Sequence, residues 1–203
     1  MPNPNISNFI SAFEGGARAN RFDVLLSFPS DLASTGTDVT KKLAFTCKGA
    51  SIPASNIGKV EVPYMSRQIA VAGDRTIDDW TITVINDVKY EVRIAFERWM
   101  NAINAHENNT AQTSGWHDPK KYYATAIVTQ YSREHDDAPA AISYTMHGIF
   151  PTALSDISLG WGDNDSVEEF TVTLACNWWV PNWDTDSDTV GTVTANSAVL
   201  SFA

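Results

Sequence analysis

The sequence predicts a mainly β fold, an antiparallel β-sandwich or barrel-like domain that carries one long α-helix. Apolar and polar residues alternate in about eight or nine short runs, which is typical of strands with one buried face. One stretch, residues 92–103, instead repeats its apolar residues every three or four positions, as one face of a helix does. The runs are joined by short connections, and hairpin-length connections pair consecutive strands antiparallel.

Residues 71–103 contain both periodicities and organise the predicted domain. In the strand expected over residues 77–85, Trp80 and every second residue after it point to the same side. Asn86 or Asp87 is placed to cap the first turn of the helix that follows, because a short side-chain oxygen accepts from a free N–H there. We expect the core to be centred on three aromatic residues: Trp80, Phe96 and Trp99.

Residues 1–20 are predicted to be an arm that precedes the β-domain. Gly15 and Gly16 end a short stretch of helical spacing in this arm. An apolar stripe on so short a segment needs a partner surface, which is either the same molecule or a neighbouring copy. The stripe consists of Ile6, Phe9, Ile10 and Phe13.

The β-domain is predicted to span residues 21–181, with a long hairpin in its first half. Gly73 and Asp74 predict a turn after that hairpin. The elements expected before this turn are a strand at 21–28, a polar loop at 29–40, a strand through Leu43, Phe45 and Cys47, and hairpin strands at 58–64 and 67–71 joined near Met65.

The second half of the β-domain follows the long helix and a polar loop at residues 104–119. Pro151 and Pro181 are expected to end strands, because proline cannot donate to a ladder. The composition changes after the last strand, so residues 182–203 are predicted to be a C-terminal extension. The expected strands are 122–131, 141–150 and 167–180, with a charged turn at 132–139 between the first two.

The balance of 14 Lys and Arg against 24 Asp and Glu gives a formal net charge of −10. This argues against a protein that grips nucleic acid, because phosphate neutralisation needs a basic surface, although DNA could still slide past an acidic wall. No run approaches the ~18 apolar residues of a membrane span, and residues 1–9 lack the pattern of a secretory signal. Cys47 and Cys176 are expected to be free buried thiols in a reducing compartment.

No catalytic set, cofactor motif or metal site is predicted, and an enzyme is therefore not expected. The His residues match neither an HExxH pattern nor a zinc spacing. The acidic groups near Asp163 and Asp184 lack the Gly and distal Glu of a calcium loop.

One charged group stands out at the start of the central strand: Asp74, Arg75, Asp78 and Asp79. An Arg side chain among three carboxylates is expected to be held by ion pairs. Such a group is either an ordinary surface network, which contributes little to stability, or a contact that crosses a subunit boundary and fixes its register.

The most distinctive run in the chain is AGDRTIDDWTITVINDV at residues 72–88. FEGGARANRFDV at 13–24, FTCKGASIPA at 45–54 and EEFTVTLACNWW at 168–179 occur around it. Together, in order and over roughly residues 6–179, these blocks resemble the tail tube proteins of contractile-tailed bacteriophages. The loop at residues 30–40 and the segment after residue 180 depart from the family pattern.

This resemblance implies a structural virion protein of the phage tail, assembled in the cytoplasm of a bacterial host. Family members form a homo-hexamer ring, and rings stack into a hollow tube through which DNA passes without specific binding. The implied partners are the tail sheath protein and the baseplate and tail terminator proteins, with no membrane and no cofactor. Because arm and hairpin are the usual contacts between rings, the contact candidates are Phe9, Phe13, Tyr64 and Met65, to which we add Asp74, Arg75, Asp78 and Asp79.

Two other functions are compatible with the residues. A tube protein of a bacterial contractile injection system, of the type VI or pyocin kind, has the same fold and stacking, but the AGDRT…DDW run favours the phage branch. A carbohydrate-binding β-sandwich would use exposed Trp side chains for stacking on sugar rings. The candidates for such stacking are Trp116, Trp161, Trp178, Trp179 and Trp183.

Overall fold

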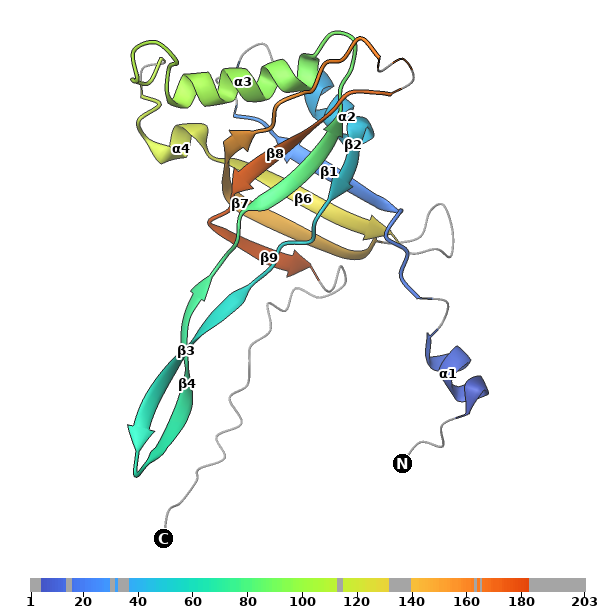
Figure 1. Ribbon diagram of the computed structural model, residues 1–203, viewed down its shortest axis with the longest axis vertical. Helices are drawn as coiled ribbons and strands as arrows, with labels where there is room; N and C mark the ends of the chain where they lie inside the picture. The colour runs from blue at the N-terminus through green and yellow to red at the C-terminus, as the bar shows by residue number, and fades with distance from the viewer. Residues whose placement is uncertain are drawn as a thin grey trace.

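The structure is a computed structural model that describes residues 5–13, 16–29, 32, 37–112, 115–131, 140–162, 164 and 166–182. Its described part is mainly β, as predicted, with one long helix, α3 (Figure 1). The helices are α1 (Ile6–Phe13), α2 (Thr37–Thr46), α3 (Glu91–Ile103) and α4 (Pro119–Tyr122). The strands are β1 (Phe22–Ser27), β2 (Cys47–Ala50), β3 (Asn56–Tyr64), β4 (Arg67–Thr76), β5 (Trp80–Ile85), β6 (Ala124–Tyr131), β7 (Ala140–Leu154), β8 (Glu169–Ala175) and β9 (Trp178–Asn182).

Seven of these strands form one antiparallel sheet that follows the path β1-β6-β7-β8-β5-β2, with β9 paired to β7 beside it. The strand β7 is the joint of this sheet, since its first part pairs with β6 and β9 and its last part pairs with β8. The strands β3 and β4 pair only with each other and form a separate hairpin. The antiparallel prediction is therefore confirmed.

The core lies between the sheet and α3, which crosses one end of the strands (Figure 1). Trp80, Phe96 and Trp99 are at most 1% exposed. The ring of Phe28 joins the two aromatic residues of the helix, at centroid distances of 5.3 Å to Phe96 and 5.7 Å to Trp99. Both buried indoles keep a hydrogen bond, from Trp80 to the carbonyl of Ser51 and from Trp99 to the carbonyl of Tyr122. Trp80 and Trp99 are thus buried without losing their polar partners, whereas the buried indole nitrogen of Trp116 has no hydrogen-bond partner among the described residues.

The start of α3 is held by Asp87, one of the two residues predicted to cap it. The residue at the cap position itself is Tyr90, with φ 57°, and its side chain makes no capping bond. The Oδ1 atom of Asp87 instead accepts from the N–H of Glu91 at 3.0 Å. A carboxylate three residues before the cap position therefore satisfies one of the free donors of the first turn.

The prediction of a strand through Leu43, Phe45 and Cys47 is wrong for its first two residues. They belong to α2, in which Val39 and Leu43 face the core at a spacing of four and Phe45 points to solvent. Leu43, Phe45 and Cys47 alternate with polar or small residues, and this alternation predicts a strand instead of a helix. Only Cys47 begins a strand, β2. The helix also starts at Thr37, inside the segment predicted as a polar loop.

Three predicted breaks are not where the sequence placed them. The turn at Gly73 and Asp74 is absent, because β4 continues to Thr76 and Gly73 packs against the backbone of Gly58 across the hairpin. Pro151 lies inside β7, at a shift in its register with β8, and Pro181 lies in β9, which pairs with β7 alone. Prolines are tolerated at such irregular and edge positions because no ladder donor is needed there.

The last predicted strand is divided into β8 and β9 between Ala175 and Trp178. The division lies opposite Gly148, where β7 changes direction with φ 64°. A Cβ atom at Gly148 would lie 2.4 Å from Nδ2 of Asn177, so this position needs glycine both for its backbone conformation and for space.

Lys42 connects α2 to the start of α3. Its ammonium group contacts the carboxylates of Asp87 and Glu91, the latter at 2.7 Å. These hydrogen bonds raise the pKa of Lys42. Burial alone would raise the pKa of Asp87, but Lys42 and two backbone N–H groups outweigh it and hold that pKa below its usual value.

We expect Trp99→Ala to lower the free energy of unfolding by about 3–5 kcal/mol, because it removes the largest fully buried side chain of α3 and leaves a cavity. Trp161→Ala is the matched control, since that indole is fully exposed, and it should change stability by less than about 0.5 kcal/mol. Urea titrations of the unassembled protein measure both values. Equal effects would contradict the assigned core.

We expect Lys42→Met to destabilise the protein at neutral pH and to have a progressively smaller effect in acid. Asp87 has a lowered folded-state pKa, so its contribution to stability is present above the unfolded value of about 3.9 and is lost as the pH falls through the folded value below it. Denaturant unfolding of both proteins at a series of pH values checks this. A difference that does not shrink as the pH falls below the unfolded value of about 3.9 would show that the Lys42 contact is not linked to this carboxylate.

Candidate assembly surfaces

The hairpin of β3 and β4 projects from the body of the molecule (Figure 1). Its turn consists of Met65 and Ser66, with φ values of 42° and 66°, which is the sign pattern of the type I′ turns that close tight hairpins. The predicted long hairpin with a turn near Met65 is thereby confirmed. Apart from the half-buried Gly73, every residue of the two strands is exposed, so the hairpin has no partner within the described chain.

One face of this hairpin is apolar. The register places Val60 opposite Val71 and Val62 opposite Ile69, and these four side chains are 47% to 52% exposed. The opposite face carries Lys59 and Glu61, which form an ion pair, and small or polar residues across from them. An isolated two-stranded hairpin is marginally stable in water, and a continuous exposed apolar face indicates a binding surface. We call these four residues the apolar hairpin face.

The base of the hairpin is fastened to the body on both sides. The indole N–H of Trp179 donates to the carbonyl of Ala54 at 3.2 Å, and that of Trp80 donates to Ser51 at 2.8 Å. The segment between β2 and β3 is therefore held by two tryptophans of the sheet. Asn56 adds a hydrogen bond to Asp78 at 2.9 Å, so the hairpin leaves the body in a fixed direction.

The charged group at the end of β4 does not form the expected ion pairs. Arg75 donates to the hydroxyl of Ser55 at 3.2 Å, and among the described residues it has no carboxylate partner within 4.0 Å. The physical reason is that β4 continues through this position, and neighbouring residues of a strand point to opposite faces. Asp74, Arg75, Asp78 and Asp79 are all exposed and remain available to a partner.

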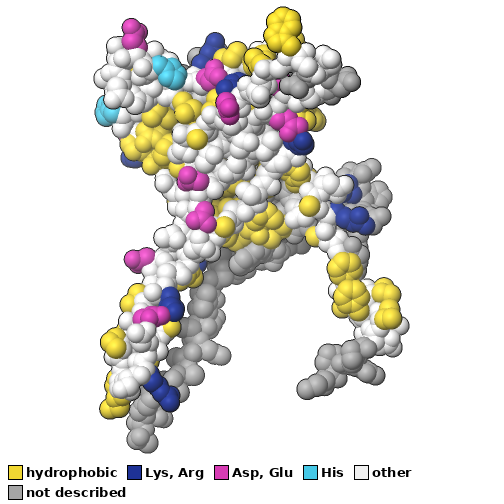
Figure 2. Space-filling view, in the orientation of Figure 1, with side chains coloured by type: hydrophobic (Ala, Val, Ile, Leu, Met, Phe, Trp, Pro, Cys, Tyr) yellow, Lys and Arg dark blue, Asp and Glu magenta, His cyan; other side chains and the backbone are white. Residues whose placement is uncertain are grey.

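The helix α1 is the second projecting apolar element. The prediction of a short helix is confirmed over Ile6–Phe13, and none of its residues is buried. The rings of Phe9 and Phe13 stack at 5.4 Å from each other and face solvent. Figures 1 and 2 show that α1 and the hairpin extend from the same end of the body, and both carry exposed apolar side chains.

The sheet also offers open edges. Within the described residues, β1 pairs only with β6, β2 only with β5 and β9 only with β7. The outer N–H and C=O groups of such strands can pair with a strand of another chain.

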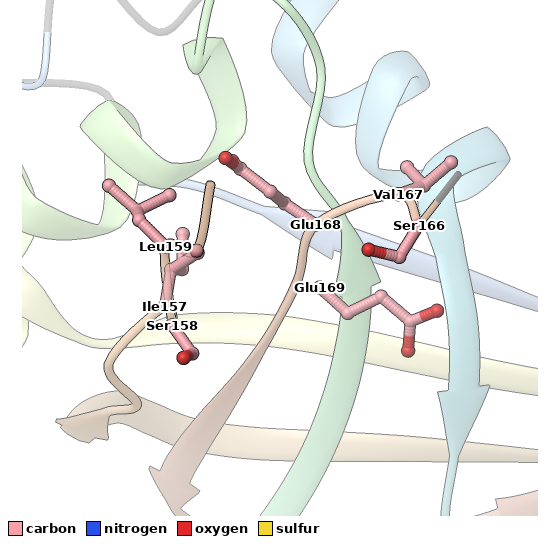
Figure 3. A pocket seen from close by; sticks show the side chains of 8 residues that line it. Ile157, Ser158, Leu159, Ser166, Val167, Glu168 and Glu169 are labelled. Atoms are coloured by element: carbon pink, nitrogen blue, oxygen red, sulfur yellow. The ribbon is translucent and has the colours of Figure 1, made fainter. Parts of the chain in front are cut away.

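The opposite end of the molecule carries an apolar surface that sequence reasoning missed. Leu159 is 77% exposed, Val88 is 98% exposed and Trp161 is fully exposed. A pocket of about 380 Å³ lies there between residues 157–160 and 166–169, and we call it the apical pocket (Figure 3). The sequence shows this segment only as an incomplete calcium loop, with Trp161 as its one aromatic signal.

Neither a metal-binding cluster nor an activated thiol is found among the described side chains. No group of three or more His, Cys, Asp or Glu among them is placed to hold a metal ion. Burial raises the pKa of the Cys47 thiol to about 11 and also raises that of Cys176, so neither free thiol is an activated nucleophile. In the part of the chain that the structure describes, no helix is long and apolar enough to cross a membrane.

The tryptophans considered for sugar stacking do not form a common platform. Trp116 is buried in the core, and Trp179 packs edge-on against Tyr144. Trp178 is half exposed, but its ring stacks on His147 at 3.9 Å. Trp161 stands alone at the far end of the molecule, and Trp183 lies outside the described residues.

Comparisons with known proteins find tail tube proteins that match over most of the chain. The tail tube protein gp19 of Enterobacteria phage T4 is 36% identical over 176 residues, which cover 86% of this chain and 98% of that protein. A tail tube protein of Serratia phage KSP90 is 29% identical over 160 residues, covering 79% and 85%.

Solved structures of contractile injection systems share the fold. A chain of the sheath–tube complex of an extracellular contractile injection system matches with a TM-score of 0.53 at 14% identity, over 88% of this chain and 98% of that one. A chain of the anti-feeding prophage baseplate matches with a TM-score of 0.57 at 10% identity, over 81% and 94%. Residues 17–182 match the family described as phage tail tube protein, and the chain therefore belongs to that family.

Proposed function

We propose that six copies of this chain form a ring, that rings stack into the tube of a contractile phage tail, and that DNA passes through the tube. The observation that carries this proposal is the apolar hairpin face, which no described residue of the chain covers. In a member of the tail tube family, further copies of the same chain are the partners at hand.

The geometry favours a contact between unlike surfaces of successive copies. The two projecting apolar elements, α1 and the hairpin, leave the same end of the body (Figure 1). Such a head-to-tail contact closes when it runs around a ring and extends without limit when it runs along an axis. The open edges of β1, β2 and β9 would pair with strands of neighbouring copies in the same ring. The backbone groups that these edges expose in a single copy would then be covered in the tube.

The outward faces of the sheet suit the passage of DNA. On β6 and β7, Thr125, Thr129 and Thr145 alternate with core residues, and β5 and β8 present Thr81 and Thr173 in the same way. Among the described residues, the outward positions of these four strands contain no Lys or Arg. A channel lined by the outward face of β6 and β7, or by that of β5 and β8, would not hold phosphates, because no Lys or Arg at these positions neutralises their charge.

The contact residues named from the sequence become part of this proposal. Phe9 and Phe13 of the arm, Tyr64 and Met65 at the hairpin tip, and the charged group from Asp74 to Asp79 are all exposed and free to meet another copy. The extension at residues 182–203 lies outside the described residues except for Asn182. The sheath, baseplate and terminator would then bind the finished tube, as the sheath–tube complex of the injection system suggests.

We expect the pair Val62→Lys and Ile69→Lys to abolish tubes while leaving the body folded, because two ammonium groups would replace the centre of the apolar hairpin face. Glu61→Lys with Ala70→Lys is the matched control, since these residues face each other on the opposite side of the same hairpin. Negative-stain electron microscopy and thermal unfolding measure the two effects. Normal tubes from the first pair would contradict the proposed role of this face.

We expect Phe9→Ser with Phe13→Ser to reduce tube formation without changing the melting temperature, because both rings are exposed in the single chain and the body does not depend on them. Ser11→Ala on the same helix should have no effect on either quantity. Sedimentation of assembled material checks this prediction. A lowered melting temperature with unchanged tubes would place the arm on its own body instead.

A further inference from the structure

The hairpin tip and the apical pocket lie at opposite ends of the molecule (Figure 1). A head-to-tail contact along an axis needs two complementary surfaces in this arrangement, one at each end of the same chain. The tip is the projecting surface, and the apical pocket is the concave surface at the other end.

One wall of the apical pocket, which contains Glu168 and Glu169, is fixed by hydrogen bonds. Oε2 of Glu168 accepts from the hydroxyl of Tyr90 at 2.7 Å and from the side-chain amide of Asn86 at 3.1 Å. The backbone N–H of Asn86 donates to the carbonyl of Glu168 at 2.8 Å. Glu169 pairs with Lys48 at 2.6 Å. The pocket is therefore tied to the start of α3 and to β2, and it is formed in the single chain.

The chemistry of the pocket is apolar on one side and acidic on the other. Ile157, Leu159 and Val167 supply the apolar lining, while Glu168 and Glu169 supply two carboxylates that point in different directions (Figure 3). None of the residues that line it is Lys or Arg, although Lys48 beside it already pairs with Glu169. Such a site fits a partner that carries apolar side chains together with a cation.

The hairpin tip has this composition. Met65 is 82% exposed and Tyr64 is 60% exposed. Arg67 lies opposite Tyr64 in the register, is exposed, and is the cation closest to the turn. An apolar cavity of about 150 Å³ accommodates a benzene ring, so a pocket of about 380 Å³ has room for the side chains of the tip.

We propose that the hairpin tip of one copy docks in the apical pocket of the next copy along the tube axis. Met65 and Tyr64 contact Leu159 and Val167, and the guanidinium of Arg67 lies near the pocket carboxylates. This inference rests on the proposed function, because it names the surface that receives the hairpin in the stacked tube.

The test uses a full-length double variant, Met65→Cys with Leu159→Cys, allowed to assemble and then treated with a short bismaleimide. Docking brings the two cysteines of successive copies together, so a denaturing gel should show a ladder of covalently linked chains. The control pair is Met65→Cys with Glu107→Cys, which keeps the same tip cysteine and moves the second one to an exposed site beyond the other end of α3. The two single variants and the unsubstituted chain report any reaction of Cys47 and Cys176.

A ladder from the first pair alone supports the docking. Tubes in the micrographs without a ladder would overturn it, and so would equal linking of the control pair. An unsubstituted chain that forms no tubes would contradict the proposed function itself, and this failure is visible by microscopy before any linker is added.

Discussion

The constraint on which the rest of this structure depends is an apolar surface that no described residue of the chain covers. The residues Val60, Val62, Ile69 and Val71 lie on a hairpin that projects from the body, and hydrogen bonds fasten its base to the sheet. Trp80 and Trp179 hold the segment leading into β3, and both belong to strands of the sheet. In the described part of the chain the apolar hairpin face is therefore exposed, and such a face is available to another molecule.

The core and the assembly surfaces are consequently parts of one arrangement. The aromatic cluster of Phe28, Phe96 and Trp99 sets α3 across the end of the strands, and Lys42 and Asp87 attach α2 to the same corner. That corner carries the apical pocket, because Tyr90 and Asn86 reach Glu168 from the start of the helix. Packing in the interior thus positions the surface at one end, while the tryptophans of the sheet position the hairpin at the other.

Local periodicity was enough to predict the strands β1 and β5, the helix α3 and the tight turn at Met65, because each has one dominant pattern. It failed where two patterns competed, as in α2, and where the register of a neighbouring strand decided the outcome, as at Pro151 and Gly148. The candidate contacts in the arm and hairpin came from exposed apolar residues and from family resemblance. The apical pocket could not be predicted, because hydrogen bonds between segments about eighty residues apart create it.

The alternation of faces along the hairpin limits how its length can change. Removing one residue from each strand would shorten the hairpin but exchange its two faces, so that charged side chains would replace the valines against a neighbour. Removing two from each strand would preserve the faces and draw the tip inward by roughly 6–7 Å. Hairpins of altered length should therefore assemble only when each strand loses or gains an even number of residues. Each such change would alter the distance between successive rings.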